Sequence, residues 1–215
     1  MTVAEKYLFT LKNGEIKLRS YIGKDKHVVI PEKIGPYPVI ELYKGCFSEY
    51  KHKNPVLRSI VVPKTIKIVP DNAFAGCRKL HSVTLEEGVE TIGSAAFAYC
   101  SNLKNIKISN SVTSIGAFAF YRCISLNFIR IPESVQSLST PFFGCTSLYK
   151  IEVDEANPIF DCRDNCNAII ETATNTLIAS CQKTNIPPSV KSVAENADVY
   201  KAEYYLPYLP IWLKG

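Results

Sequence analysis

The chain has 215 residues, of which 47% are apolar and 21% are charged, and its formal net charge is +5 at pH 7. These values suit a single globular domain with a sizeable core. The charge permits an acidic partner, but lysine and arginine are not clustered as nucleic-acid binding requires. No apolar run reaches the roughly 18 residues of a membrane span, and charges interrupt the first apolar stretches, so neither membrane insertion nor a signal peptide is expected.

The N-terminal segment predicts a β-hairpin. Apolar and polar residues alternate over 7–11 and again over 16–18, on either side of Asn13-Gly14. Asn-Gly between two alternating runs is the strongest short-range hairpin signal. We therefore expect residues 1–26 to form a hairpin that caps the N-terminal end of the domain.

From residue 27 to residue 197 the sequence repeats with a period of about 23 residues. The unit reads Leu-x2-Ile-x-Ile-x3-Val-x2-Ile-x4-Phe-x2-Cys-x2-Leu, and successive Phe and Cys positions are separated by 23, 23 and 22 residues. The clearest aligned positions are Phe74, Phe97, Phe120 and Phe142, followed in the same units by Leu80, Leu103, Leu126 and Leu148. Self-similarity at such a period is typical of a solenoid.

The unit itself predicts how each coil folds. Leu-x2-Ile-x-Ile has the alternation of a strand with one buried face, and Pro63 or Pro132 ends it. Val-x2-Ile carries the chain back across the far side, and a tight turn bearing Phe and Cys closes the coil. Stacked coils place parallel strands about 4.8 Å apart and make interior ladders of the Phe, Cys and Leu side chains. Residues 35–38 and 51–55 are read as insertions.

The C-terminal part combines a second hairpin with the end of the repeat. Apolar runs at 168–170 and 176–178 flank a polar turn, which predicts a hairpin within an insertion at about 156–183. The repeat resumes at 186–193. Residues 198–215 form an aromatic, proline-bearing segment that we expect to cap the last coil, so the whole chain is one structural domain.

Several stretches resemble the BspA-like leucine-rich repeat family. They are IPEKIGPYPVIEL, IGSAAFAYC, and NPIFDCRDNCNAIIETATNTLIASC followed by IPPSV. The resemblance covers about residues 27–197 and implies a right-handed, β-rich solenoid with short helical or 3-10 turns. It also implies a bacterial cell-surface or secreted adhesion protein that binds host or matrix proteins.

The eight cysteines do not predict a common site. Four share one repeat position, Cys77, Cys100, Cys123 and Cys145, and are expected to be small, buried, reduced thiols. Their Cβ atoms should lie about as far apart as the strands, beyond the usual disulfide range of about 3.5–4.5 Å. Cys46 is also expected inside. Cys162 and Cys166 lie in a loop, and the sequence leaves open whether they or Cys181 are oxidised.

No motif predicts catalysis, a metal or another cofactor. No CxxC pair suggests zinc, and the acidic residues at 154–164 match no calcium-loop spacing, which favours a solvated loop. The histidines His27, His52 and His81 have no nucleophile and carboxylate arranged around them, and the GxSxG, Walker A and GxGxxG motifs are absent. His81 is expected to be a surface residue on a strand. We therefore expect a protein that is not an enzyme.

The outward positions of the strands are the expected binding surface. They are small and neutral in the first coils, but Lys107, Phe128, Arg130 and Lys150 place one aromatic ring among three cations. Aromatic and arginine side chains are frequent anchors of interfaces. We expect these four residues to contact a protein partner, with the loop at 154–167 as the next candidate. The alternative function is a scaffold that self-associates through the solenoid ends, in a manner dependent on residues 198–215.

Overall fold

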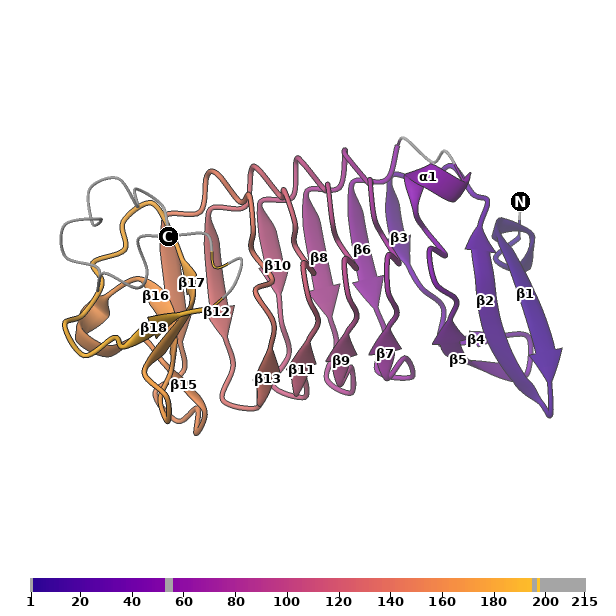
Figure 1. Ribbon diagram of the computed structural model, residues 1–215. Coiled ribbons are helices and arrows are strands. Elements are labelled where there is room, and N and C mark those ends of the chain that lie inside the picture. The colour runs from indigo at the N-terminus through magenta and orange to yellow at the C-terminus, as the bar shows by residue number, and fades with distance from the viewer. Residues whose placement is uncertain (1, 53–55, 195–196, 198–215) are drawn as a thin grey trace.

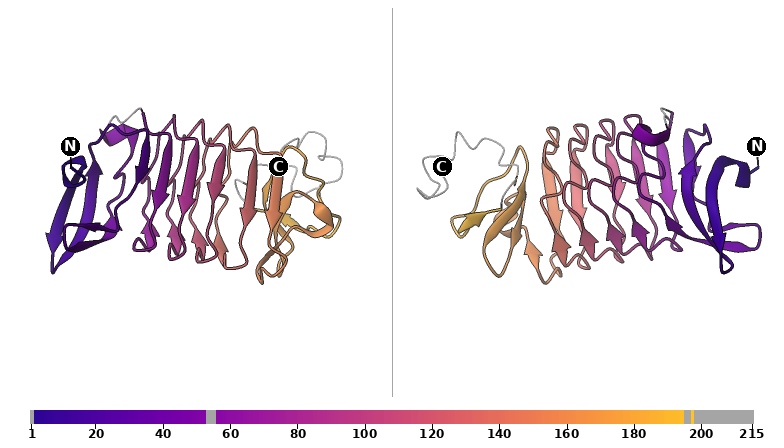
Figure 2. Two further views of the ribbon diagram at one scale, coloured as in Figure 1. Left: turned by 180° about the vertical axis from the view of Figure 1, so that it is seen from behind. Right: turned by 45° about the vertical axis from the view of Figure 1, so that its right-hand side comes forward.

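The computed structural model describes residues 2–52, 56–194 and 197. Stacked coils form an elongated solenoid with a strand hairpin at each end (Figures 1 and 2). Parallel strands run along both sides of the stack. The repeat predicts those of the Leu-x2-Ile-x-Ile side, and the structure adds short strands on the side of the returning chain. The capping role predicted for residues 198–215 falls outside the described residues and stays a prediction.

One side of the solenoid carries the strands predicted from Leu-x2-Ile-x-Ile. Equivalent repeat positions pair between coils, so that Val83 lies opposite both Ile60 and Ile106. Residues on either side of the middle apolar residue point outward, because burial alternates along each strand. The strands are β3 (His27–Val29), β6 (Ser59–Val62), β8 (Ser82–Leu85) and β10 (Asn105–Lys107) in one sheet, and β12 (Phe128–Ile131) and β14 (Lys150–Val153) in another.

The strand side is interrupted between β10 and β12, which belong to different sheets. The repeat predicts one continuous sheet with Ile106 and Ile108 in the core. Both are only partly buried, whereas Ile129 and Ile131 in the next coil are fully buried. Backbone hydrogen bonds hold neighbouring strands about 4.8 Å apart. Where the two sheets separate, solvent reaches these two isoleucines.

The other side of the solenoid is a four-stranded parallel sheet made by the predicted Val-x2-Ile return. Equivalent residues again pair, with Ile115 opposite Ile92 and Leu138. The strands are β7 (Ile68–Val69), β9 (Thr91–Ile92), β11 (Ser114–Ile115) and β13 (Ser137–Leu138).

The turns that close the coils build the predicted interior ladders. The rings of Phe47, Phe74, Phe97, Phe120 and Phe142 stack in sequence, with centroids 5.1, 5.1, 5.5 and 5.4 Å apart. In the four turns from Phe74 onward, two residues have left-handed backbone angles, two positions before and two positions after the Phe. These residues are Asn72, Ala95, Phe118 and Thr140, and Gly76, Tyr99, Arg122 and Gly144.

At the N-terminal end, the predicted hairpin is present and joins the first coil. Asn13 and Gly14 have positive φ values of 52° and 77°, as a tight two-residue hairpin turn requires. The second strand of the hairpin pairs in parallel with the first coil, and Tyr21 extends the phenylalanine stack at 5.1 Å from Phe47. Residues 35–38, read as an insertion, belong to a second short hairpin. The elements are η1 (Ala4–Lys6), β1 (Tyr7–Lys12), β2 (Glu15–Tyr21), β4 (Lys33–Ile34), β5 (Tyr37–Leu42) and α1 (Glu49–His52).

At the C-terminal end, the second predicted hairpin forms the centre of a four-stranded sheet. Its two strands pair Ala168 with Ser180 and Glu171 with Thr176. The elements are β15 (Phe160–Asp161), η2 (Arg163–Asn165), β16 (Ala168–Glu171), β17 (Thr176–Ser180) and β18 (Ser192–Val193). This sheet comes directly after β14 in the chain, so the loop before it adjoins the last strand of the solenoid face.

Candidate functional site

Strands β12 and β14 bring three of the four predicted binding residues together. Parallel pairing sets Phe128 opposite Lys150 and Arg130 opposite Glu152. Lys107 is also exposed, but it pairs with Thr84 on β8 and stands across the sheet boundary from β12. We call Phe128, Arg130 and Lys150 the sheet-face patch.

Phe128 is the aromatic centre of the sheet-face patch. Its side chain is 36% exposed, and the Lys150 ammonium lies 5.6 Å from the centroid of its ring. A cation at this distance over a ring is attracted by the ring quadrupole, which holds the lysine stem over the aromatic face. The ring and the ammonium therefore form one contact unit on the surface.

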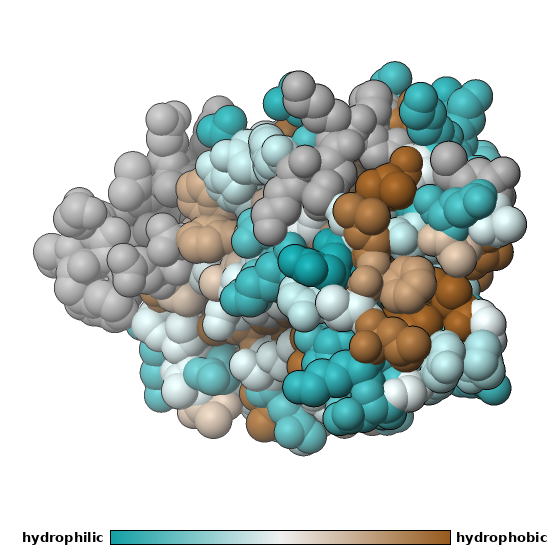
Figure 3. Space-filling model, turned by 90° about the vertical axis from the view of Figure 1, so that its right-hand side faces the viewer, coloured by the Kyte–Doolittle hydropathy of each residue, from teal (hydrophilic) through white to brown (hydrophobic). Residues whose placement is uncertain are grey.

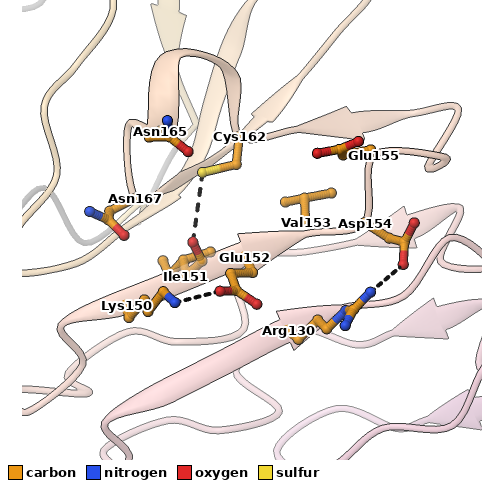
Figure 4. A pocket seen from close by; sticks show the side chains of 10 residues that line it. All are labelled: Arg130, Lys150, Ile151, Glu152, Val153, Asp154, Glu155, Cys162, Asn165 and Asn167. Carbon is orange, nitrogen blue, oxygen red and sulfur yellow. Dashed lines mark hydrogen bonds and ion pairs between the residues drawn. The ribbon is translucent and has the colours of Figure 1, made fainter.

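Arg130 and Lys150 are both paired with acidic side chains of this chain. The Arg130 guanidinium donates to Asp154 at 2.8 Å, and Lys150 lies 2.5 Å from Glu152 (Figure 4). The hydrogen bond from Arg130 lowers the pKa of Asp154 below its ordinary value. The sequence predicts an excess of positive charge around Phe128, and the structure instead shows alternating charges of both signs.

A hollow of about 620 Å³ adjoins the sheet-face patch (Figure 4). One wall is the outward side of β12 and β14, with the Arg130 and Lys150 ion pairs. The other wall comes from the loop between β15 and β16 and includes Cys162, Asn165 and Asn167. The two candidate surfaces considered from the sequence, the strand face and the loop at 154–167, thus line two sides of one hollow.

Aromatic side chains on the turns form a second surface that the repeat pattern does not predict. Tyr50, Tyr99, Phe118, Tyr121 and Phe143 line a groove of about 420 Å³ whose remaining walls are mainly alanine. The rings contact one another: Tyr121 lies 5.0 Å from Tyr99 and 5.9 Å from Phe143. The signal in the sequence is the extra aromatic residues beside the repeat Phe, which interior slots do not require.

The predicted row of thiols is present and buried. Each thiol donates to the carbonyl oxygen of the repeat Phe in the preceding coil, at 3.1–3.2 Å. Burial raises the pKa of Cys100 and Cys123 well above the ordinary value, so these thiols stay protonated. All eight cysteines lie in the described part of the chain, and each is a thiol.

The structure describes the surroundings of possible metal ligands and of two histidines. Among residues 2–52, 56–194 and 197, no three His, Cys, Asp or Glu side chains are placed to hold a metal ion. His81 is exposed on the strand side as expected, and its Nδ1 lies 2.5 Å from the Lys79 carbonyl oxygen. His27 contacts the Ser59 hydroxyl at 2.8 Å.

Comparison with protein families places the chain. The profile of the BspA type leucine rich repeat region matches residues 41–170 in six copies. The chain belongs to this family. A search of curated protein sequences found no match. No described helix of this BspA-type protein is long and apolar enough to span a membrane.

Solved structures of bacterial leucine-rich repeat proteins resemble this BspA-type chain. The T. pallidum leucine-rich repeat protein is 28% identical with a TM-score of 0.65, and the match covers 70% of each chain. A leucine-rich repeat protein from Bacteroides ovatus is 28% identical with a TM-score of 0.56, over 69% of this chain and 39% of that one. The pneumococcal vaccine antigen PcpA shares the fold at 23% identity, with a TM-score of 0.63 over 88% of this chain and 58% of its own.

Proposed function

We propose that this BspA-type protein is a non-enzymatic binding module that holds a partner protein against the open strand face of its solenoid. The observation that carries the proposal is the half-exposed Phe128 beside a hollow lined by paired charges of both signs. A buried aromatic anchor surrounded by a polar rim is the usual arrangement of a protein interface. The family resemblance supports an adhesive role toward host or matrix proteins.

The paired charges define the kind of partner surface that fits. Arg130 and Lys150 already have intrachain partners at 2.8 and 2.5 Å, so an acidic partner gains little unless it displaces them. A partner loop with an apolar tip and both acidic and basic groups beside it matches this surface. Such complementary charges favour specificity and association rate more than affinity. We extend the surface to Lys107 across the sheet boundary.

The experiment compares binding by variants of the strand face. A panel of soluble matrix proteins is tested by surface plasmon resonance against the wild type and the double variant Phe128→Ala with Arg130→Ala. We expect at least about a tenfold loss of affinity, because removing a central aromatic and its neighbouring arginine typically costs 2 kcal/mol or more. The melting temperature should stay nearly unchanged, since both side chains are largely outside the core.

Two further variants make the result specific. Ser82→Ala with Thr84→Ala alters outward positions on β8, two coils away, and should leave binding intact. Tyr99→Ala with Tyr121→Ala removes two rings of the aromatic groove. Retained binding in the Phe128 and Arg130 variant, together with loss in the Tyr99 and Tyr121 variant, would move the binding surface to the turns.

A second candidate function, a scaffold that self-associates through its ends, is favoured by the N-terminal hairpin. The edge strand β1 exposes Leu8, Phe9 and Leu11, with exposed fractions of 52%, 37% and 47%. Figure 3 views the solenoid from this end, where hydrophobic side chains gather into a patch. An apolar edge strand is a template for pairing with another chain. This candidate predicts an oligomer, whereas a simple binder is a monomer.

A further inference from the structure

Cys162 and Cys166 differ from the other cysteines in their position and contacts. They flank the single turn η2, and their Sγ atoms lie 3.9 Å apart. Cys166 is buried, with 1% of its surface exposed, whereas Cys162 is partly exposed and lines the hollow beside the sheet-face patch (Figure 4). The Cys162 sulfur is thus accessible to solvent, whereas the Cys166 sulfur is shielded by the protein.

Contacts outside the pair hold this turn in place. The Arg163 guanidinium donates to both carboxylate oxygens of Asp161, at 2.8 and 2.5 Å, and to the Asn175 side chain at 2.6 Å. The Cys166 amide also donates to the Arg163 carbonyl at 3.1 Å. A disulfide needs sulfur atoms about 2.0 Å apart. Rotation of the side chains can cover this difference, because the braced backbone already places the sulfurs in contact.

The chemical environment favours reaction at Cys162. The hydrogen bond with the Cys166 thiol, outweighing partial burial, lowers the pKa of Cys162 to about 6, so its thiolate predominates at neutral pH. The same hydrogen bond and burial raise the pKa of Cys166. Burial likewise raises the pKa of the interior thiols Cys46 and Cys77, to about 12 in the case of Cys46. A partly exposed thiolate beside a shielded thiol is the arrangement of an attacking and a resolving cysteine.

We propose that Cys162 and Cys166 form a redox site that exchanges with small disulfides. The Cys162 thiolate attacks one sulfur of the small disulfide and breaks its S–S bond. One half is then joined to Cys162, and the other half leaves as a thiolate that takes the proton of the Cys166 thiol. The Cys166 sulfur next attacks the Cys162 sulfur and breaks the mixed disulfide, and the second half leaves as a thiolate that takes a proton from water. The two protein thiols are oxidised to one disulfide, and the small disulfide is reduced to two thiols.

The hollow indicates which small disulfides enter. The hollow that Cys162 lines also carries Arg130 and Lys150 together with Glu152 and Asp154 on its opposite wall. Groups of both signs suit a ligand that carries ammonium and carboxylate groups together. The geometry therefore points to a zwitterionic disulfide of the cystine class rather than a neutral one.

The test uses the full reduced chain and cystine as the probe. Intact mass spectrometry should show the loss of two hydrogens with one equivalent of cystine reduced. Trypsin cuts after Arg163, so the bridge joins the peptide of Cys162 to the peptide 164–183. Because that peptide also contains Cys181, the same bridge in Cys181→Ser assigns it to Cys166. Cys166→Ala should stop at the mixed disulfide and keep a half-cystine on Cys162. Cys162→Ser should lower the rate of oxidation by at least about tenfold, because the buried thiol is shielded.

Three controls keep the proposal open to refutation. Cys181→Ser should behave as the wild type, since Cys181 is buried and donates to the Asn167 carbonyl at 3.3 Å. No bridge in the folded wild-type chain, or an unchanged rate in Cys162→Ser, would overturn the site. The rates of the protein with cystine and with neutral 2-hydroxyethyl disulfide are each divided by the rate of the same disulfide with N-acetylcysteine, which corrects for its intrinsic reactivity. Equal ratios for the two disulfides would overturn the ligand class. None of these outcomes depends on partner binding.

Discussion

Truncation of a stacked phenylalanine should cost much of the stability of the solenoid. Phe97 is fully buried, and its ring lies 5.1 Å from Phe74 and 5.5 Å from Phe120, almost parallel to both. Phe97→Ala removes the ring but not the coils around it. The Phe97 and Phe74 amides donate to the Ala119 and Ala96 carbonyls at 2.8 Å, which fixes the spacing between coils.

The magnitude depends on this rigidity. Because the rings of Phe74 and Phe120 cannot move together, the cavity left by the Phe97 ring persists. The free energy lost with the buried ring and the cost of the cavity therefore add. We expect a loss of roughly 3–5 kcal/mol in the free energy of unfolding, the range for buried Phe→Ala changes. Phe97→Leu keeps most of the volume and should cost less. Phe128→Ala, on the exposed face, should cost under about 1 kcal/mol.

Urea unfolding followed by circular dichroism measures the difference. The comparison requires that the slope of free energy against urea concentration be equal in wild type and variant. A repeat protein can lose two-state behaviour when one coil is weakened, and the slope would then change. A changed slope calls for native-state hydrogen exchange, coil by coil. A loss below about 1 kcal/mol for Phe97→Ala would show that the stacked rings do not carry the stability attributed to them.

The remaining predictions concern the solenoid ends. Hydrogen bonds from Arg163 outweigh partial burial and lower the pKa of Asp161 below 3.8. The pair therefore stabilises the fold above that pH, and its contribution to stability is lost as the pH falls through the lowered pKa. The melting temperature of Asp161→Asn should therefore fall less between about pH 5 and pH 2 than that of the wild type, and parallel curves would contradict this. If the ends associate, light scattering should show wild-type oligomers that Leu8→Lys with Leu11→Lys converts to monomers. A wild type that is monomeric at every concentration would exclude the scaffold.

The interior was predictable because the same apolar positions recur in each coil, so that the burial of one residue predicts the burial of its equivalents. Phe97, Cys100 and Leu103 are all fully buried, as their recurrence in every unit indicates. Periodic apolar residues can satisfy their burial only by stacking, so the position of one residue fixes the position of its equivalents. The Asn13-Gly14 hairpin was equally predictable, because few dipeptides tolerate its backbone angles.

The contacts between unlike positions were not predictable from the repeat. Arg130 and Asp154 meet at 2.8 Å because neighbouring coils place them side by side, yet neither belongs to the consensus. Asn157, read as part of a solvated loop, is buried and donates to the Pro132 and Val135 carbonyls at 2.8 and 2.9 Å. A buried amide that satisfies backbone groups of another coil leaves no periodic trace in the sequence.

Three departures from the regular repeat lie in one region of the solenoid. The strand side divides after β10, exposed Phe128 lies on the next strand, β12, and the loop with Cys162 folds beside β14. A regular stack of identical coils needs none of these features for its stability, since its ladders are complete without them. Residues that depart from the repeat can therefore vary without loss of the fold, because the interior ladders maintain it. For this reason we propose the C-terminal part of the strand face for both the partner surface and the cysteine pair.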